Sequence, residues 1–199
     1  MRSETPTSLR SWKSRLSAAA AVAALALTVA AVPARGAGSS LDVVGQSDLG
    51  GRGLNAGLAL ADLNAALDWL RDTTGFERLG TIGFCMGGTF VLQLAARRQD
   101  LASACFYGFP AQMGAEERAA VKGPVLGFWG DQDAGVGMAN VEQLRRELAA
   151  RGVEHDFTIY PGLGHGFMKA SGLEPGGEGY DQACEAWTRT LDFYRGKLA

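Results

Sequence analysis

An α/β fold, with a parallel sheet flanked by helices on both faces, is the class that this sequence predicts. The first observation is that short apolar runs alternate with longer segments in which apolar residues recur at helical spacing. The second is a glycine-rich turn at residues 83–88, which joins one apolar run directly to a helical segment. The runs that we predict to be strands are residues 78–84, 102–109, 125–129 and 154–160.

Helices are predicted before, between and after these strands, at residues 58–71, 89–98, 115–122, 139–151 and 180–198. The first has leucines at i, i+3, i+7 and i+10, which are Leu60, Leu63, Leu67 and Leu70. The fourth ends before Gly152, a residue type that favours helix termination. The last follows a loop over residues 161–179. It carries a stripe that we expect in the core, formed by Ala183, Trp187, Leu191 and Tyr194.

The first 35 residues have the pattern of a secretory signal peptide. Basic residues precede an uncharged run at residues 18–32, and Val32-x-Ala34 fits a cleavage site. The run is shorter than the ~20 residues of a typical transmembrane helix. The alternatives are an added extension or an Ala-rich helix of the fold. We predict export, periplasmic or secreted, if the leader is genuine, and otherwise a cytoplasmic protein. Residues 36–57 are predicted to be irregular or a linker, and residues 58–199 to form the domain.

The charge balance argues against partners that are polyanions. The chain holds 19 basic and 21 acidic residues, and without residues 1–35 it holds 14 and 20, a net charge of −6. We therefore expect no binding to nucleic acid and no stable membrane insertion after leader removal. The three cysteines are widely spaced, so neither a disulfide framework nor a zinc site is predicted. We expect no metal and no organic cofactor.

The turn at residues 83–88 has the G-x-S-x-G pattern of a nucleophile elbow, with Cys85 in place of serine. Such a turn projects its nucleophile at a helix N-terminus, which stabilises a thiolate. Gly83 and Gly87 are both expected to be required by close packing of strand and helix. The alternative is a small buried thiol, which is the role that we predict for Cys105 and Cys184.

A thiol nucleophile needs a base, and an acid that orients the base. Of the two histidines, His165 lies in a Gly-flanked loop after the fourth strand, whereas His155 lies within that strand. Loops at strand ends carry function more often, so His165 is the better candidate. The segment after the third strand offers two acids, Asp131 and Asp133, and either of them is compatible with a simple turn role. The order Cys, Asp, His is that of α/β-hydrolases.

Together these segments resemble the dienelactone hydrolase family, whose members are α/β-hydrolases with a Cys-Asp-His triad. The resemblance covers roughly residues 58–198. It rests on three motifs: IGFCMGG at 82–88, GDQD at 130–133 and YPGLGHGF at 160–167.

The resemblance implies roles for six residues. It makes Cys85 the nucleophile, Asp133 the acid and His165 the base. The Met86 N–H becomes an oxyanion-hole donor. Lys169 becomes a cation that can hold a substrate carboxylate, and Tyr107 lines the pocket. The implied activity is hydrolysis of a small ester or lactone.

The chain departs from the family before the elbow. Members have about four more strands there, whereas here about four strands are recognisable in all, so we expect a truncated α/β-hydrolase fold. We find no counterpart of the early loop that supplies a second oxyanion donor, a Glu that gates the thiol and an Arg that grips the substrate. Alternatives to an efficient enzyme are therefore a weak or inactive hydrolase-like domain, or a small-molecule binding module. An uncovered first strand also predicts a possible homodimer.

Overall fold

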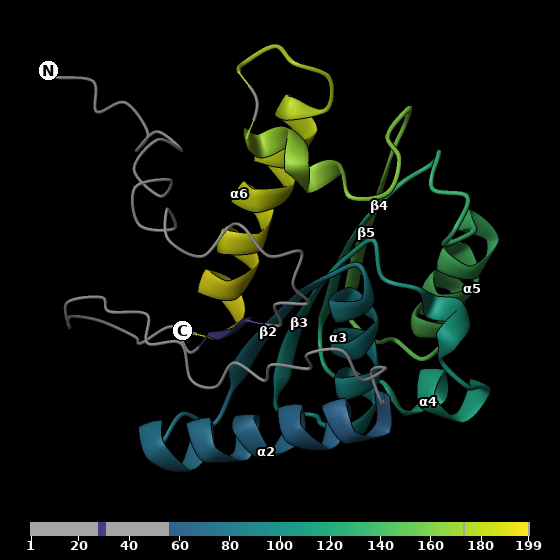
Figure 1. Cartoon of the computed structure of the whole chain (residues 1–199). Coiled ribbons are helices and arrows are strands. Elements are labelled where there is room, and N and C mark those ends of the chain that lie inside the picture. Colours follow the sequence, from purple (N-terminus) through teal and green to yellow (C-terminus); the bar gives the residue numbers. More distant parts are fainter. Residues whose placement is uncertain (1–27, 31–55, 173, 199) are drawn as a thin grey trace, which may run out of the picture.

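The computed structural model describes residues 28–30, 56–172 and 174–198 of this chain. In that part of the chain a sheet has the strand order β1-β2-β3-β4-β5 (Figure 1). Strands β2 to β5 are parallel, and β1 pairs antiparallel with β2. The strands are β1 (Thr28–Ala30), β2 (Leu79–Phe84), β3 (Leu101–Phe106), β4 (Val125–Gly130) and β5 (His155–Tyr160). The predicted parallel sheet of four strands is confirmed.

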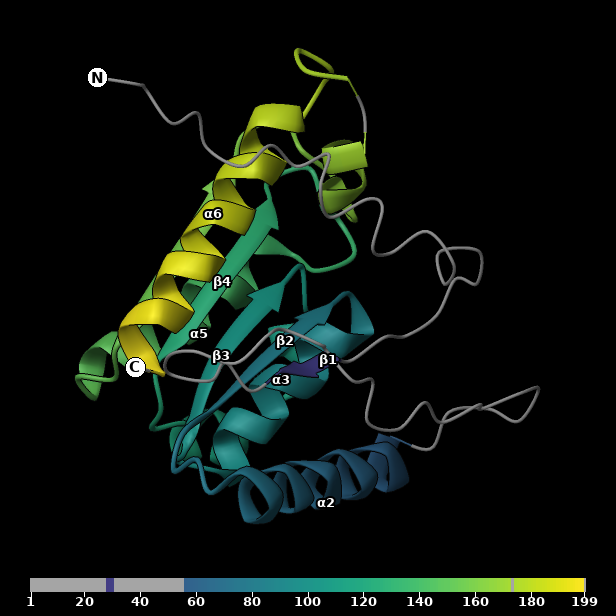
Figure 2. The ribbon, with the colours of Figure 1, turned by 90° about the vertical axis from the view of Figure 1, so that its left-hand side faces the viewer.

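Helices cover both faces of this sheet, as predicted. Helices α3 and α5 lie on one face and α6 on the other, while α2 runs across the end at which the parallel strands begin (Figures 1 and 2). The helices are α2 (Ala56–Thr74), α3 (Met86–Arg97), α4 (Ala115–Ala120), α5 (Met138–Ala150) and α6 (Tyr180–Lys197). Two 3₁₀ turns, η1 (Pro110–Gln112) and η2 (Phe167–Gly172), lie in the connections. None of the described helices is long and apolar enough to cross a bilayer.

The register of the parallel strands brings their carboxyl ends to one edge. Phe84 pairs with Phe106, Phe106 with Phe128, and Gly130 with Tyr160. The residues that follow these strands are therefore neighbours in space, although they are far apart in sequence. All candidate site residues come from these connections or from the helices that begin there.

Two apolar clusters hold the layers together. The larger one contains Phe106, Phe128 and Trp129, which are fully buried, and packs the sheet against α3, α5 and α6. The smaller one joins α2 to α3 and to the first strands through Leu60, Leu67, Leu79, Phe90, Leu94 and Leu101. The predicted leucine stripe of α2 is thus confirmed, with Leu60 and Leu67 buried and Leu63 and Leu70 packed beside them.

A buried arginine reinforces the contact between α2 and the start of β3. Arg98 is 8% exposed, and its guanidinium donates to Asp68 at 2.6 Å and to Asp100 at 2.6 Å. The hydrogen bond from Arg98 is the main cause that holds the pKa of Asp100 below its ordinary value. This ion cluster lies at the end of the sheet opposite the candidate site.

Several predicted boundaries and one predicted core position are wrong. The second strand ends at Phe106 rather than at 109, because Tyr107 has a φ of 40°, which no strand residue adopts. Residues 56 and 57 belong to α2 rather than to an irregular segment. In α6, Leu191 is 39% exposed, whereas Thr190 is buried. At 3.6 residues per turn, Leu191 is rotated by roughly 80° from Ala183, while Thr190 is rotated by only about 20°.

Most of the predicted leader and most of the predicted irregular segment lie outside the described residues. The described part of the leader is β1, Thr28–Ala30, which pairs with Gly80–Ile82 along the edge of β2. The edge that we predicted to be open is therefore paired over three residues. These residues come from a segment that cleavage after Ala34 would remove.

Candidate active site

Cys85 occupies a sharp turn between β2 and α3. Its backbone has φ 56° and ψ −122°, a conformation that costs a non-glycine residue about 1–3 kcal/mol. The Cys85 N–H donates to the Phe106 carbonyl at 3.0 Å, and the Cys85 carbonyl accepts from the Thr89 N–H at 3.2 Å. The turn is thus anchored to β3 on one side and to the first turn of α3 on the other. The predicted strand–turn–helix geometry is present.

Close packing around the turn explains two glycines, but not both of those that we predicted. A Cβ on Gly83 would lie 2.1 Å from the Gly87 carbonyl oxygen, and a Cβ on Gly88 would lie 2.7 Å from the Phe106 carbonyl oxygen. A Cβ on Gly87 would meet nothing within 4 Å, so the expectation for Gly87 is wrong. Gly87 takes part through its backbone, because its carbonyl is the group that excludes a side chain at position 83.

The start of α3 supplies the electrostatics that a thiolate needs. Met86 is the first residue of the helix, and the first amides of a helix have no partner within it. Their N–H groups and the helix dipole favour negative charge beside them. Cys85 is a free, partly buried thiol at this position. Cys105, by contrast, is fully buried, and burial raises its pKa to about 12, which suits a structural role. Cys184 is partly buried, so it is less enclosed than predicted.

The structure pairs His165 with Asp133 rather than with Asp131. His165 Nδ1 lies 2.6 Å from Asp133 Oδ2. Asp133 is 3% exposed, and its other oxygen, Oδ1, accepts the Val136 N–H at 3.3 Å. The hydrogen bond from the Val136 N–H fixes the orientation of this buried carboxylate. Its second oxygen, Oδ2, is therefore held toward His165 Nδ1 and orients the imidazole. Between the two acids that the sequence offered, this contact favours Asp133.

Tyr107 lies beside His165 and is close enough to Cys85 to sense its charge. Its ring meets the His165 ring edge-on, with 5.0 Å between centroids, and meets Phe167 edge-on at 5.4 Å. The pKa of Tyr107 is raised by burial and, to a smaller extent, by the negative charge that Cys85 can carry. Tyr107 therefore keeps its proton near neutral pH. Its φ of 40° is the second non-glycine backbone in the left-handed region, after that of Cys85. Within the described residues, both such positions follow adjacent strands at this edge.

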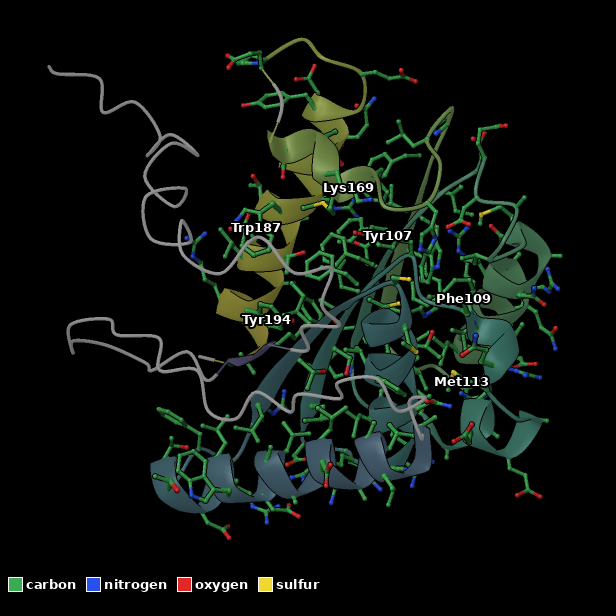
Figure 3. The ribbon with its side chains drawn as sticks, in the orientation of Figure 1. Tyr107, Phe109, Met113, Lys169, Trp187 and Tyr194 are labelled. Atoms are coloured by element: carbon green, nitrogen blue, oxygen red, sulfur yellow. The ribbon has the colours of Figure 1, made fainter. Side chains whose placement is uncertain are left out.

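Phe109 is a site residue that sequence reasoning missed. Its ring centroid lies 5.5 Å from that of His165, and its N–H donates to the Thr89 hydroxyl of α3 at 2.9 Å. Figure 3 shows Tyr107 and Phe109 on the connection that follows β3. Both lie beyond the end of β3, whereas the sequence predicts a strand that extends to residue 109. A turn predicted at residue 107 would have ended the strand there and placed Phe109 in the connection. Tyrosine rarely adopts a positive φ, so the sequence pattern does not indicate such a turn.

Lys169 lies on η2 and shares a cavity with His165. The cavity measures about 310 Å³, and its lining includes His165, Phe167, Lys169 and Glu178. Lys169 and Tyr107 both lie at the end of the sheet where the strands finish (Figure 3). Cys85 is not among the described residues that line this cavity. No group of three or more His, Cys, Asp or Glu side chains suited to a metal ion occurs among the described residues.

The family model for the dienelactone hydrolase family matches residues 50–198, which contain every element described from α2 to α6. The chain belongs to the dienelactone hydrolase family. The matched residues include the turn at Cys85, the Asp133–His165 contact and the four parallel strands. The match begins eight residues before the domain boundary that we predicted.

Individual relatives agree with this assignment. The carboxymethylenebutenolidase of Rhodococcus opacus is 31% identical over 152 residues, which cover 72% of this chain and 59% of that protein. The solved structure named m3DLH matches with a TM-score of 0.61 and 25% identity, over 72% of this chain and 62% of that one. Esterase PE8 matches with a TM-score of 0.51 and 26% identity, over 72% and 62%. The chain spans 50–59% of the length of the first three curated relatives that it matches.

Proposed function

We propose that this domain hydrolyses small carboxylic esters or lactones through an acyl-enzyme on Cys85. The observation that carries the proposal is the 2.6 Å contact of His165 with buried Asp133, at the same sheet edge as a thiol on a strained turn. Membership of the dienelactone hydrolase family supports the reaction class. Related proteins that carry the name carboxymethylenebutenolidase support a lactone as the substrate.

The first half of the proposed reaction forms a thioester. Asp133 accepts a hydrogen bond from the Nδ1–H of His165, so the proton stays on Nδ1 and Nε2 is free to act as the base. Nε2 takes the Sγ proton of Cys85, and the thiolate attacks the carbonyl carbon. The carbonyl oxygen becomes an oxyanion beside the Met86 N–H. The C–O bond to the alkoxide then breaks, and the alkoxide takes the proton from His165. In a lactone the alkoxide stays tethered to the acyl group.

The second half releases the acid. His165 Nε2 removes a proton from water, and the hydroxide adds to the thioester carbonyl. The C–S bond then breaks, the carboxylic acid leaves, and the Cys85 thiolate takes the proton back from His165. Tyr107 and Phe109 flank the imidazole and restrict where its ring can turn. We propose that Lys169, on the same cavity as His165, attracts a substrate carboxylate. The proposal includes no metal and no cofactor.

The test is hydrolysis of p-nitrophenyl acetate by the wild type and by Cys85→Ala. We expect wild-type turnover that iodoacetamide abolishes, and only background hydrolysis by Cys85→Ala. Cys184→Ala is the matched control, because it removes the other partly buried thiol and lies outside the site. Equal, background-level hydrolysis by the wild type and Cys85→Ala would refute the enzymatic proposal. It would leave the domain as an inactive or ligand-binding relative.

A further inference from the structure

The carboxylate of Asp131 joins the loop that carries His165 to the end of β4. Asp131 directly follows β4, and Gly162 lies in the loop that follows β5. The Gly162 N–H donates to Asp131 Oδ1 at 2.7 Å. The same oxygen accepts from the Gln132 side chain at 3.0 Å. Asp131 itself is exposed, so its side chain contributes little to the core.

Two backbone hydrogen bonds accompany this contact. The Asp131 N–H donates to the Tyr160 carbonyl at 3.0 Å, and the Gln132 N–H donates to the Leu163 carbonyl at 2.9 Å. Between these two bonds the loop turns at Gly162, whose φ is +78°. The Asp131 carboxylate holds the amide at that turn. The other two hydrogen bonds join backbone atoms only, so the bond to the Asp131 carboxylate is the one of the three that a substitution can remove.

Two acids of the segment at residues 130–133 thus contribute to the position of His165. Asp133 bonds the imidazole directly, and Asp131 bonds the backbone three residues before the imidazole. A misplacement of about 1 Å in a reacting group can cost on the order of 100-fold in rate. His165 is 36% exposed on its side chain, so the core packs on it only in part. The loop backbone therefore sets much of its position.

We propose that Asp131 is a positioning residue, which holds the loop at residues 161–165 so that His165 meets Asp133 and Cys85. This inference rests on the proposed function, in which His165 is the base. Asp131 touches no reacting atom. Its loss should therefore lower kcat more than it changes KM. Residues 162–165 line one side of the cavity around Lys169, but Lys169 itself lies on η2, outside the segment that Asp131 holds.

Three substitutions separate the position of the acceptor from its charge. Asp131→Ala removes the acceptor, and we expect kcat for p-nitrophenyl acetate to fall roughly 10-fold with KM within about twofold. Asp131→Asn keeps an oxygen at Oδ1 without the charge and should recover most of that loss. Asp131→Glu keeps the charge but carries the oxygens one methylene further, so it should resemble Asp131→Ala. Glu77→Ala, which removes an exposed acid before β2, is the control for charge loss and should match the wild type.

A second readout keeps this inference distinct from the proposed function. The His165 Nδ1 proton, shared with Asp133, should give a sharp low-field NMR signal in the wild type and in Asp131→Asn. It should broaden or disappear in Asp131→Ala and Asp131→Glu. If the wild type shows no Cys85-dependent turnover, the proposed function fails, and the NMR signal alone decides on Asp131. An unchanged signal in Asp131→Ala, or equal loss of kcat in the Asn and Glu variants, would overturn the positioning role.

Discussion

Replacing Asp133 with asparagine tests the site most directly, because the structure dictates how the new amide turns. One carboxylate oxygen of Asp133 faces His165 Nδ1 at 2.6 Å, and the other accepts the Val136 N–H at 3.3 Å. An amide has one oxygen and one NH₂ group. If the oxygen keeps the Val136 bond, the NH₂ faces His165 and forces the proton onto Nε2. In that tautomer the lone pair lies on Nδ1, where it accepts from the amide, and Nε2 has none with which to take a proton from Cys85.

The magnitude follows from the cost of turning the amide around. The reversed orientation loses one hydrogen bond and leaves the Val136 N–H against a donor, together about 2–3 kcal/mol. The productive orientation is then populated at about 0.6–3%. A neutral amide also stabilises the imidazolium less than a carboxylate does, by about 1 kcal/mol, or roughly fivefold. We therefore expect kcat to fall roughly 10²- to 10³-fold.

The assay is steady-state hydrolysis of p-nitrophenyl acetate at pH 7, with thermal unfolding measured on each variant. Asp131→Asn is the matched control, since it makes the same chemical change two residues away at an exposed position. A fall in kcat below about tenfold for Asp133→Asn would show that His165 does not depend on Asp133 for its tautomer. An equal fall in kcat for Asp133→Asn and Asp131→Asn would contradict the assignment of Asp133 as the acid that orients His165.

Two further predictions concern stability. Gly83→Ala places a Cβ 2.1 Å from the Gly87 carbonyl oxygen, so the free energy of unfolding in urea should fall by about 1–3 kcal/mol, with loss of hydrolysis. Gly87→Ala should cause no loss of stability, because its Cβ has open space; a larger loss there than at Gly83 would contradict the packing argument. Arg98 holds the pKa of Asp100 below its ordinary value of 3.8, so this contribution to stability is complete above about pH 4 and declines as the pH falls through the lower, folded-state pKa. Acid unfolding followed by circular dichroism should therefore show a shallower loss below pH 4 for Asp100→Asn than for the wild type, and identical slopes would refute the linkage.

Much of the fold could be predicted because its signals are local. The apolar runs of β2 to β5 and the leucine spacing of α2 are properties of short segments, and the structure has these elements within a few residues of the predicted bounds. The errors occur where a segment depends on its surroundings. The predicted second strand ends three residues too late, since the chain turns at Tyr107, a residue type that does not favour turns. The predicted core position of Leu191 is wrong because two successive spacings of four residues, summed over two turns, depart from the 3.6-residue repeat of the helix.

In the candidate site, too, the features with local signatures could be predicted and those that depend on distant segments could not. The residue types and their order, which are Cys85, then two acids, then His165, can be predicted from the sequence because a nucleophile elbow and strand-end loops have local signatures. The folded chain is needed to show that Asp133 faces the imidazole, that Phe109 flanks it, and that Asp131 bonds the loop. Asp131 and Asp133 are separated by one residue and are chemically identical. Their contacts differ because the turn after β4 buries the Asp133 carboxylate against His165 and leaves Asp131 at the surface. That arrangement depends on the pairing of β4 with β5, which brings the loops that follow the two strands together.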